Sequence, residues 1–285
     1  MRFLSLERDE GNLKITAIDA HPDVTADSLF KQIPDSQSPI AIGLGPGDFV
    51  FSFLPREDGM TDAELENHLR WEIGKKVISE ASEYNVDYAL IGNRGFAFAG
   101  RKKLISGLSS QGRKIFTDVE PAALFNGVEG AGEFENGVMV LVSIEGEGIS
   151  SVVVEKGIPV GIDSTPFKES VLAKSISNSN PLNFQGMDDL SVERLAEQVI
   201  ESISRITILG ENKKNPSPDI IVLAGGGVYA GNLPNIIETL SGVKVKISSP
   251  FKNITGGLDL VQSSFSGKDA AFTTCLGLAL RAMEV

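Results

Sequence analysis

The hydrophobic and polar residues of this chain divide it into many short strands and a few amphipathic helices. Residues 2–6 form a mostly apolar run, and residues 13–18 alternate between apolar and polar side chains, which is typical of a half-buried strand. A polar turn at residues 9–12 separates the two runs, so we predict a β-hairpin there. Further strands are predicted at residues 40–44, 49–54, 85–91, 95–99, 138–144, 149–154, 158–162, 220–224 and 243–247.

The helices are predicted from apolar spacing and from residues that begin and end helices. Thr61 followed three residues later by Glu64 is a capping box, and it predicts a helix over residues 62–76 with Leu65, Leu69 and Ile73 on one face. Residues 175–188, rich in Ser and Asn, are the most loop-like stretch. Other helices are predicted at residues 25–32, 101–111, 119–125, 190–209 (with Ser191 as its cap), 233–241 and 269–283.

A second hairpin begins about half a chain after the first. Residues 3–7 and 141–145 share the pattern apolar-apolar-Ser-apolar-Glu, and each is followed by a turn and a second strand. We interpret the two as an internal duplication. Ligands in duplicated α/β architectures sit where strand ends meet glycine-rich turns, and residues 225–227 form such a turn after a buried strand.

Composition places the chain among ordinary globular proteins. Its 285 residues suggest about two domains, and 41% are hydrophobic and 22% charged. The net charge of −12 argues against non-specific binding of nucleic acid. A single cysteine, Cys275, excludes an internal disulfide framework and fits a buried small hydrophobe, while two histidines leave little room for a histidine-based metal site. The early acidic residues and the lack of an apolar run of about 20 residues lead us to expect a cytoplasmic protein.

Six segments carry recognisable motifs in order along the chain. Residues 64–73 contain Arg-Trp-Glu on a predicted helix, residues 86–92 contain Asp-Tyr on a predicted strand, and residues 117–124 contain Asp-x-Glu. Residues 222–227 end in three glycines, residues 249–251 are Ser-Pro-Phe, and residues 277–281 lie in the last predicted helix. In this order they resemble the Arg-Trp-Glu helix, the Asp-Tyr strand, the Asp-x-Glu linker, the glycine loop, the Asn-Pro-Phe and the closing helix of the PilM family of type IV pilus assembly proteins. That family belongs to the actin-like ATPase superfamily, of which FtsA is a more distant match.

The resemblance implies an α/β, actin-like (ribonuclease H-like, duplicated) fold of two lobes with a small inserted α+β subdomain. The first lobe is expected at residues 1–52, 113–137 and 270–285, and the insert at residues 53–112. The second lobe is expected at residues 138–269, with a reduced small subdomain because the stretch between residues 161 and 190 is shorter than in the family.

The resemblance also predicts a degenerate nucleotide site. The superfamily carries Asp-x-Gly in each phosphate-binding hairpin, and here the Asp positions align with Ser5 and Ser143 and the Gly positions with Glu7 and Glu145. A hydroxyl is a poorer magnesium ligand than a carboxylate. A Glu facing triphosphate adds about 4 kcal/mol of repulsion at 4 Å for an effective dielectric constant near 20. We therefore expect a pseudo-ATPase with no catalytic residue, no metal and no cofactor.

A retained site stays open as the alternative, in which ATP and Mg²⁺ bind and the protein polymerises or switches conformation. In that reading Glu7 or Glu145 shifts by one or two places to bind the metal. Simpler interpretations are a glycine turn that needs positive φ and, for Glu120, an acid favoured in the first turn of a helix. The residues that the alternative assigns to nucleotide binding are Ser5, Glu120, Ser143, Gly146, Gly225, Gly226 and Gly227.

Finally, the resemblance implies a protein partner. PilM-like proteins bind the cytoplasmic N-terminal peptide of a bitopic inner-membrane protein, PilN, in a groove between the first subdomain and the insert. We therefore expect a scaffold of a type IV pilus or related secretion platform, peripheral to the inner membrane. The candidate lining residues, for which ordinary core is the alternative, are Phe49, Phe51, Leu69, Phe96 and Phe98. His68 and Trp71 fit either surface packing or a partner-binding edge.

Overall fold

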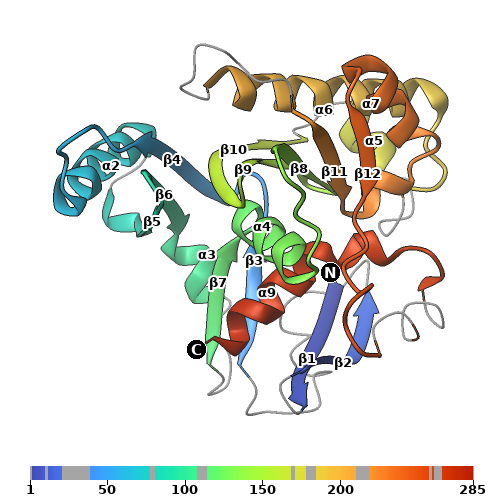
Figure 1. The fold of residues 1–285 in the computed structure, drawn as a ribbon, viewed down its shortest axis with the longest axis horizontal. Helices are drawn as coiled ribbons and strands as arrows, with labels where there is room; N and C mark the ends of the chain where they lie inside the picture. The colour runs from blue at the N-terminus through green and yellow to red at the C-terminus, as the bar shows by residue number, and fades with distance from the viewer. Residues whose placement is uncertain are drawn as a thin grey trace.

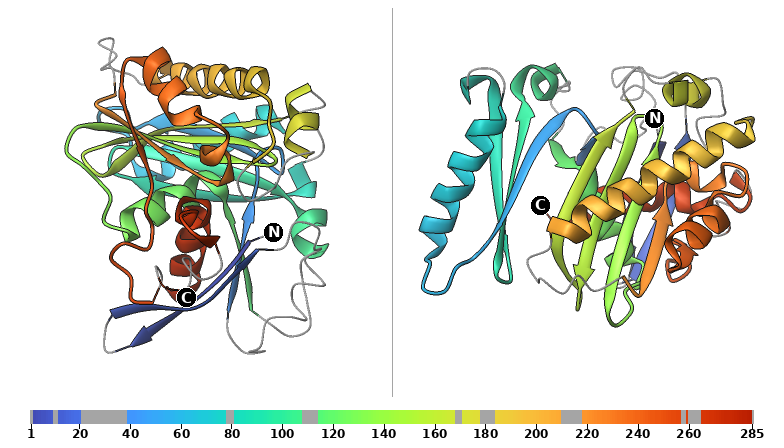
Figure 2. Two further views of the ribbon diagram at one scale, coloured as in Figure 1. Left: turned by 90° about the vertical axis from the view of Figure 1, so that its right-hand side faces the viewer. Right: turned by 90° about the horizontal axis from the view of Figure 1, so that it is seen from above.

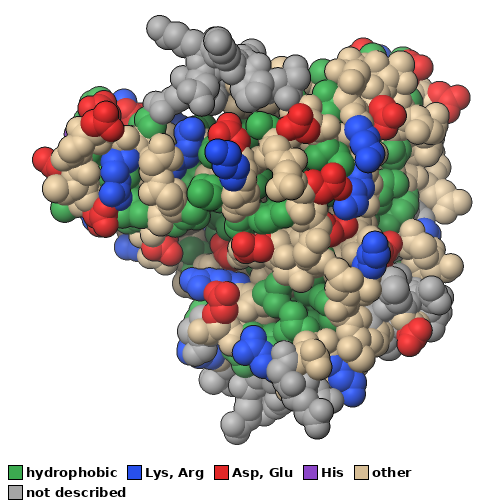
Figure 3. Space-filling model, in the orientation of Figure 1, with side chains coloured by type: hydrophobic (Ala, Val, Ile, Leu, Met, Phe, Trp, Pro, Cys, Tyr) green, Lys and Arg blue, Asp and Glu red, His purple; other side chains and the backbone are tan. Residues whose placement is uncertain are grey.

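A computed structural model shows two lobes with a small subdomain beside them (Figure 1). It describes residues 2–9, 12–20, 39–77, 81–107, 114–167, 171–177, 184–209, 218–256, 259 and 265–284 of the chain. The helix predicted at residues 25–32 lies outside these residues. Acidic and basic side chains are interspersed over the face shown in Figure 3. In the part of the chain that is described, no helix is both long enough and apolar enough to cross a membrane.

The second lobe is built on a five-stranded sheet with the order β10-β9-β8-β11-β12. The strands β8, β9 and β10 are antiparallel neighbours, whereas β11 is parallel to β8 and to β12. Their bounds are β8 (Val138–Glu145), β9 (Gly148–Glu155), β10 (Ile158–Pro166), β11 (Ile220–Ala224) and β12 (Lys244–Ile247). The predicted strands of this half are therefore confirmed.

Side chains of the sheet alternate between two apolar layers, as the period of two in a strand requires. From β8, Val140, Val142 and Ile144 pack under the helices α6 (Asp189–Leu209) and α7 (Leu233–Ser241). Its other face, with Met139 and Leu141, packs against α4 (Glu120–Gly130) and the inserted subdomain. Figure 2 shows α6 lying diagonally across the sheet.

The first lobe has less sheet than the second. The strands β1 (Arg2–Asp9) and β2 (Asn12–Ala20) form the predicted hairpin, and β3 (Ile40–Leu44) pairs in parallel with β7 (Ile115–Val119). Within the described residues these are two separate two-stranded sheets, so the duplication is visible in the hairpins but not in the sheets. The helix α9 (Thr273–Met283), preceded by the 3-10 turn η3 (Asp269–Phe272), packs against β1, β3 and α4.

Two glycines allow α4 and α9 to cross at very short range. A Cβ on Gly277 would overlap the carbonyl oxygen of Ala123, and a Cβ on Gly127 would overlap that of Thr273. The helices therefore touch backbone to backbone at this crossing. Cys275 is partly buried against the apolar cluster beside it, and burial raises the pKa of its thiol to about 12.

The inserted subdomain is a three-stranded antiparallel sheet covered on one face by a helix. Its sheet has the order β4-β6-β5 and begins at Phe49, ahead of the boundary expected at residue 53. The capping box at Thr61 is present, since Thr61 accepts from the amide of Glu64 and the Glu64 carboxylate accepts from the amide of Thr61. The elements are β4 (Phe49–Pro55), α2 (Asp62–Lys76), η1 (Ala81–Glu83), β5 (Tyr84–Ile91), β6 (Arg94–Arg101) and α3 (Lys102–Gly107).

Two local predictions are wrong. The helix α6 begins at Asp189 and its cap is Asp188, whose carboxylate accepts from the amide of Ser191 at 2.9 Å and from its hydroxyl at 2.8 Å. Ser191 therefore lies inside the first turn and is not the cap. The helix α5 (Val171–Ser177) extends into the stretch expected to be loop, whose residues 178–183 are outside the description.

Candidate functional site

The polar residues at the end of β8 gather between the two lobes. Ser143 and Glu145 share the face of β8 that carries Met139 and Leu141, and this face is directed toward α4 and the first lobe. Ser150 of β9 lies opposite Ser143 in the antiparallel register. The sequence places small hydroxyls at two paired positions, which leaves room for a side chain from α4.

That side chain is Glu120, the first residue of α4. Its carboxyl oxygens accept hydrogen bonds from the hydroxyls of Ser143 at 2.7 Å and of Ser150 at 3.2 Å. Burial, with a smaller contribution from the negative charge of Glu145, raises the pKa of Glu120 to about 8. Glu120 is therefore mostly protonated near pH 7. Ser143, expected at a magnesium position, is engaged as a donor to this carboxyl group.

Glu145 forms an ion pair between the two lobes. Its carboxylate accepts from the guanidinium of Arg2, the first residue of β1, in an ion pair whose side chains are only 12% (Arg2) and 15% (Glu145) exposed. The same carboxylate faces the backbone amide of Gly226 at 3.5 Å. An acidic group of the chain thus lies beside the glycine turn and is neutralised by a basic group from the other lobe.

The glycine turn at residues 225–227 packs directly on the end of β8. Gly225 has a φ of 86°, its amide donates to the carbonyl of Ala270 at 2.9 Å, and a Cβ there would overlap the carbonyl oxygen of Ile144. The turn continues as the 3-10 segment η2 (Gly226–Tyr229). Positive φ and close approach account for glycine at position 225, which is the simpler of the two interpretations offered by the sequence.

The turn between β8 and β9 packs on another turn of the first half. The carboxylate of Glu147 lies against Gly45, and Gly148 is packed between Pro46 and the end of β10. Burial, and then the charges of Asp48 and Glu145, raise the pKa of Glu147. Gly146 is exposed and has open space where a side chain would be, and Glu147 is exposed as well. Gly146 and Glu147 are thus the accessible residues of this turn.

Ser5 lies apart from this group. Its hydroxyl accepts from the hydroxyl of Thr16 at 3.1 Å, and it is three residues along β1 from Arg2, or about 10 Å. Figure 1 shows β1 running away from the second lobe. The repeated sequence pattern is also displaced relative to the turns, because β8 ends at Glu145 whereas β1 continues past Glu7 to Asp9. The structure therefore does not place Ser5 as the counterpart of Ser143.

The apolar residues proposed for a partner groove divide into two groups. Leu69 is fully buried under α2, while Phe96 is buried on the opposite face of the sheet, stacked on Phe53 at a centroid distance of 6.2 Å. Leu69 and Phe96 are therefore core residues, as the alternative interpretation holds. Because they lie on opposite faces of one sheet, they cannot line a single groove.

The other three aromatic residues meet at the junction of the first lobe and the insert. Phe49 contacts Phe51 and Phe98 at centroid distances of 6.2 and 6.3 Å, and the cluster includes Leu44 of β3 and Val119 of β7. Phe49 is buried, while Phe51 and Phe98 are half-buried. This junction is where the resemblance places the groove.

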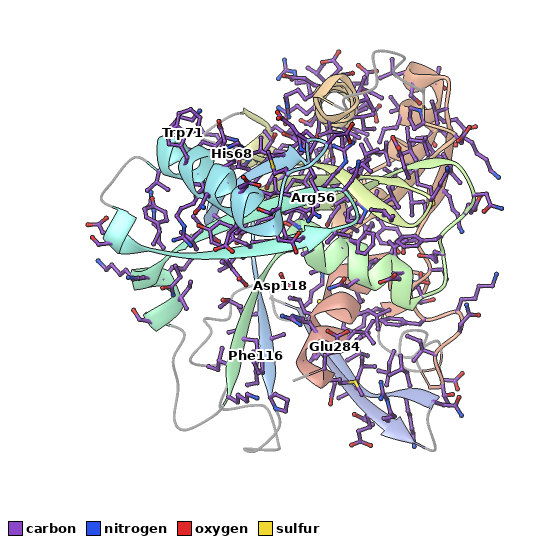
Figure 4. All side chains as sticks on the ribbon, turned by 60° about the vertical axis from the view of Figure 1, so that its left-hand side comes forward. Arg56, His68, Trp71, Phe116, Asp118 and Glu284 are labelled. Carbon is purple, nitrogen blue, oxygen red and sulfur yellow. The ribbon has the colours of Figure 1, made fainter. Side chains whose placement is uncertain are left out.

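Acidic side chains border the same junction. Asp87 of β5 lies directly opposite Phe98 of β6 in the strand register. Asp118 belongs to β7 of the first lobe. Burial raises the pKa of Asp118, Arg281 of α9 opposes that rise, and the charges of Asp87 and Glu284 add to it. Figure 4 shows Asp118 between the sheet of the insert and α9, with Glu284 nearby. Three carboxylates thus share this region with the guanidinium of Arg281, and the ammonium of Lys76 lies 5.6 Å from the ring centroid of Phe51.

His68 and Trp71 are on the outer side of α2, away from this junction (Figure 4). Trp71 is 65% exposed, and the ammonium of Lys75 lies 3.6 Å from its ring centroid. A cation over an indole ring is favourable at an exposed site. Nothing in the described residues distinguishes surface packing from a partner-binding edge here.

Sequence reasoning missed Ser150 and Arg2. Ser150 could have been predicted from the sequence, because a hairpin turn at residues 146–147 pairs Ser143 with Ser150. Arg2 was a basic residue at the start of an apolar strand, and its partner is 143 residues away. No local pattern identifies such a partner.

Comparison by sequence with protein families and with curated proteins finds no match. By structure, the chain is similar to a chain of the "PilM-PilN type IV pilus biogenesis complex", with a TM-score of 0.74 and 16% identity, covering 99% of this chain and 95% of that one. It also matches a Bacteroides thetaiotaomicron protein described as having an actin-like ATPase fold and unknown function, with a TM-score of 0.49, 13% identity and coverage of 92% and 95%. A third match is Ta0583, an archaeal actin homolog, with a TM-score of 0.39, 14% identity and coverage of 97% and 81%.

The first of these similarities extends over nearly the whole of both chains. It confirms the predicted actin-like α/β fold, and it confirms at the level of the fold the resemblance to PilM that the sequence motifs suggest. At 16% identity the likeness concerns the fold alone.

Proposed function

We propose that this chain is a non-catalytic, actin-like scaffold of a type IV pilus or related secretion platform. It binds the cytoplasmic N-terminal peptide of a PilN-like inner-membrane protein and reaches the membrane through that partner. The observation that carries the non-catalytic part is the ion pair of Glu145 with Arg2 beside the amide of Gly226. The partner is suggested by the structural similarity to a PilM-PilN complex.

The ion pair of Arg2 and Glu145 opposes the binding of a triphosphate at the glycine turn. The charges of Glu145 and Arg2 offset each other, so the pair offers a phosphate group no net attraction. To accept from the amide of Gly226, a phosphate group would have to displace the carboxylate of Glu145, which faces that amide at 3.5 Å. Displacing it would separate a buried ion pair and leave uncompensated charge, which opposes ATP at this position.

The junction of the first lobe and the insert combines apolar surface with carboxylates, a combination that suits an extended basic or amine-bearing peptide. Phe51 and Phe98 offer half-buried apolar surface. At the rim the carboxylates of Asp87, Asp118 and Glu284 outnumber two cations, Arg281 and Lys76. Apolar side chains of an extended peptide would pack on the two rings. A free N-terminal amine or a basic side chain would find the carboxylates complementary.

The first experiment tests the nucleotide half of the proposal. Calorimetric titration of the full chain with ATP in the presence of Mg²⁺ is expected to show no binding at micromolar concentrations. Phosphate release and light scattering after addition of ATP and Mg²⁺ should stay at the level of buffer. Micromolar affinity for MgATP would overturn the non-catalytic assignment and favour the nucleotide-dependent switch or filament.

The second experiment tests the partner half independently. A fluorescent N-terminal peptide of a PilN-like protein is titrated with wild type, Phe98→Ser and Trp71→Ser, the last being an aromatic control on the outer side of α2. We expect at least a tenfold loss of affinity for F98S and no change for W71S, with thermal unfolding confirming that both variants fold. Asp118→Asn should weaken a peptide with a free N-terminal amine more than its acetylated form. No binding to wild type, or equal binding to all variants, would overturn this half alone.

A further inference from the structure

Arg94, the first residue of β6, is a buried cation whose donors are largely unused. The residue is only 8% exposed, and its Nε and Nη1 atoms are both buried without a hydrogen-bond partner. Nε carries one N–H and Nη1 carries two, so three of the five donors of this guanidinium are unsatisfied. Buried polar groups in native proteins are nearly always paired, so an exception calls for an explanation, and a bound ion is one of the recognised ones.

The position of Arg94 is the seam between the insert and the second lobe. Its side chain is on the same face of β6 as Phe96, which packs against the second lobe at Val152 and Ile162. The hairpin turn just before it holds Gly92, whose Cβ position lies 3.5 Å from the side chain of Ile158 of β10. Arg94 is therefore placed where the insert packs against the second lobe.

A second arginine, Arg56, flanks this turn. Arg56 follows β4 and its amide donates to the carbonyl of Asn93 at 2.7 Å, so the two arginines flank the same turn. One Nη of Arg56 pairs with the carboxylate of Asp62, but its Nε is also buried without a partner. Figure 4 shows Arg56 at the end of α2 that lies nearer the second lobe.

An arginine cannot relieve this situation by losing its proton, because the guanidinium group stays protonated in proteins. An isolated charge in an apolar seam is strongly unfavourable unless a counter-charge and hydrogen bonds accompany it. The planar guanidinium edge matches two oxygens of a carboxylate or a phosphate. A small anion fits the high degree of burial better than a polypeptide side chain, which would bring its own backbone to the seam.

We propose that Arg94 binds a small free oxyanion of the phosphate or carboxylate class at this seam. The anion would accept from the unused donors of Arg94 and offset its charge. It would thereby connect the inserted subdomain to the second lobe. The site is distinct from the glycine turn and from the aromatic junction, so this inference does not rest on the proposed function.

The test uses the full chain, with inorganic phosphate and malonate as separate probes at constant ionic strength set with chloride. Wild type, Arg94→Met and Arg101→Met are compared by calorimetry and by thermal unfolding. Arg101 is the matched control because it lies on the same strand and is exposed. We expect at least one probe to bind wild type and R101M with sub-millimolar Kd and to raise their Tm, and R94M to lose at least tenfold in affinity. The two probes show which class of oxyanion is preferred.

A second variant guards against a failure to fold. Arg94→Lys keeps the positive charge but loses the planar fork, so it is expected to weaken binding at least tenfold, while Arg101→Lys leaves it unchanged. Equal binding and equal Tm shifts in wild type and the Arg94 variants would identify an adventitious ion only, and would overturn the proposal. Failure of both probes to bind wild type would overturn it as well.

Discussion

Arg2 and Glu145 form an ion pair although 143 residues separate them in the sequence. Arg2 begins the first strand of the first lobe, and Glu145 ends the first strand of the second lobe. The pair therefore joins the two duplicated hairpins at positions that do not correspond to each other. It also brings a carboxylate of the chain next to the glycine turn that the sequence associates with nucleotide.

The ion pair of Arg2 and Glu145 should contribute to the stability of the fold, and either partner alone should be destabilising. Removing one partner of a buried pair leaves an uncompensated charge and costs about 3–5 kcal/mol. We expect Arg2→Met and Glu145→Gln each to lower the free energy of unfolding by about that amount. The loss in the double variant should be smaller than the sum of the two single losses, with a coupling energy of about 1–3 kcal/mol. Urea unfolding of all four proteins measures this cycle.

The matched control for that cycle is Arg8→Met. Arg8 lies on the same strand as Arg2 but is exposed, so its substitution should change stability by no more than about 0.5 kcal/mol. Strict additivity of the Arg2 and Glu145 substitutions would show that the two side chains do not interact in solution.

Glu120 should make stability depend on pH in a defined direction. Its pKa is about 8 in the folded protein against an ordinary value of 4.5, so between these values the unfolded chain ionises while the folded protein stays protonated. Stability due to this group is therefore highest at low pH, falls as pH rises through the window and levels off above it. Glu120→Gln removes the effect, and its stability relative to wild type should rise with pH by up to about 1.4 kcal/mol per unit.

The measurement for Glu120 is urea unfolding at several pH values between 5 and 9. Glu129→Gln serves as control, because Glu129 lies on the same helix and is exposed. Wild type and E120Q curves that run parallel across the whole range would contradict the buried, protonated carboxyl group.

Two glycine-to-alanine substitutions in helices should change the free energy of unfolding in opposite directions. Gly277→Ala places a Cβ onto the backbone of α4, and overpacking of this kind costs about 1–3 kcal/mol. Gly74→Ala lies in α2 with no atom near the new Cβ, and it should stabilise by about 1 kcal/mol through helix propensity. Thermal and urea unfolding of the two variants decide this, and a neutral G277A would show that α4 and α9 separate easily.

Local features of this fold were accessible from the sequence. The alternation in residues 13–18 and the capping box at Thr61 depend on neighbours within a few positions, and both are confirmed. The hydrophobic face of α2, including Leu69, follows from helical spacing in the same way. Interactions of short range in sequence leave a readable pattern.

Relationships between distant segments were not accessible in this way. A register shift between Ser5 and Leu6, together with the two further residues of β1, displaces the repeated motif relative to the turn. The motif match therefore suggested Ser5 as a counterpart of Ser143 that the structure does not support. The pairing of Arg2 with Glu145 and the isolation of Arg94 depend on how whole subdomains pack, which residue spacing does not encode.

Restoring the acid that the superfamily carries at position 143 should not restore a nucleotide site. The hydroxyl of Ser143 lies 2.7 Å from the Glu120 carboxyl, so Ser143→Asp brings a second carboxyl group to a buried position. Two carboxyl groups at such a distance titrate as a coupled pair and share a proton, and a shared proton leaves a weak magnesium ligand. Ser143→Asp should therefore lose stability relative to the uncharged, similarly shaped Ser143→Asn, with the difference growing as pH rises. Calorimetry should detect no MgATP binding to either variant, and micromolar binding by S143D would mean that one missing carboxylate, and not the Arg2–Glu145 pair, is what separates this chain from an ATP-binding protein.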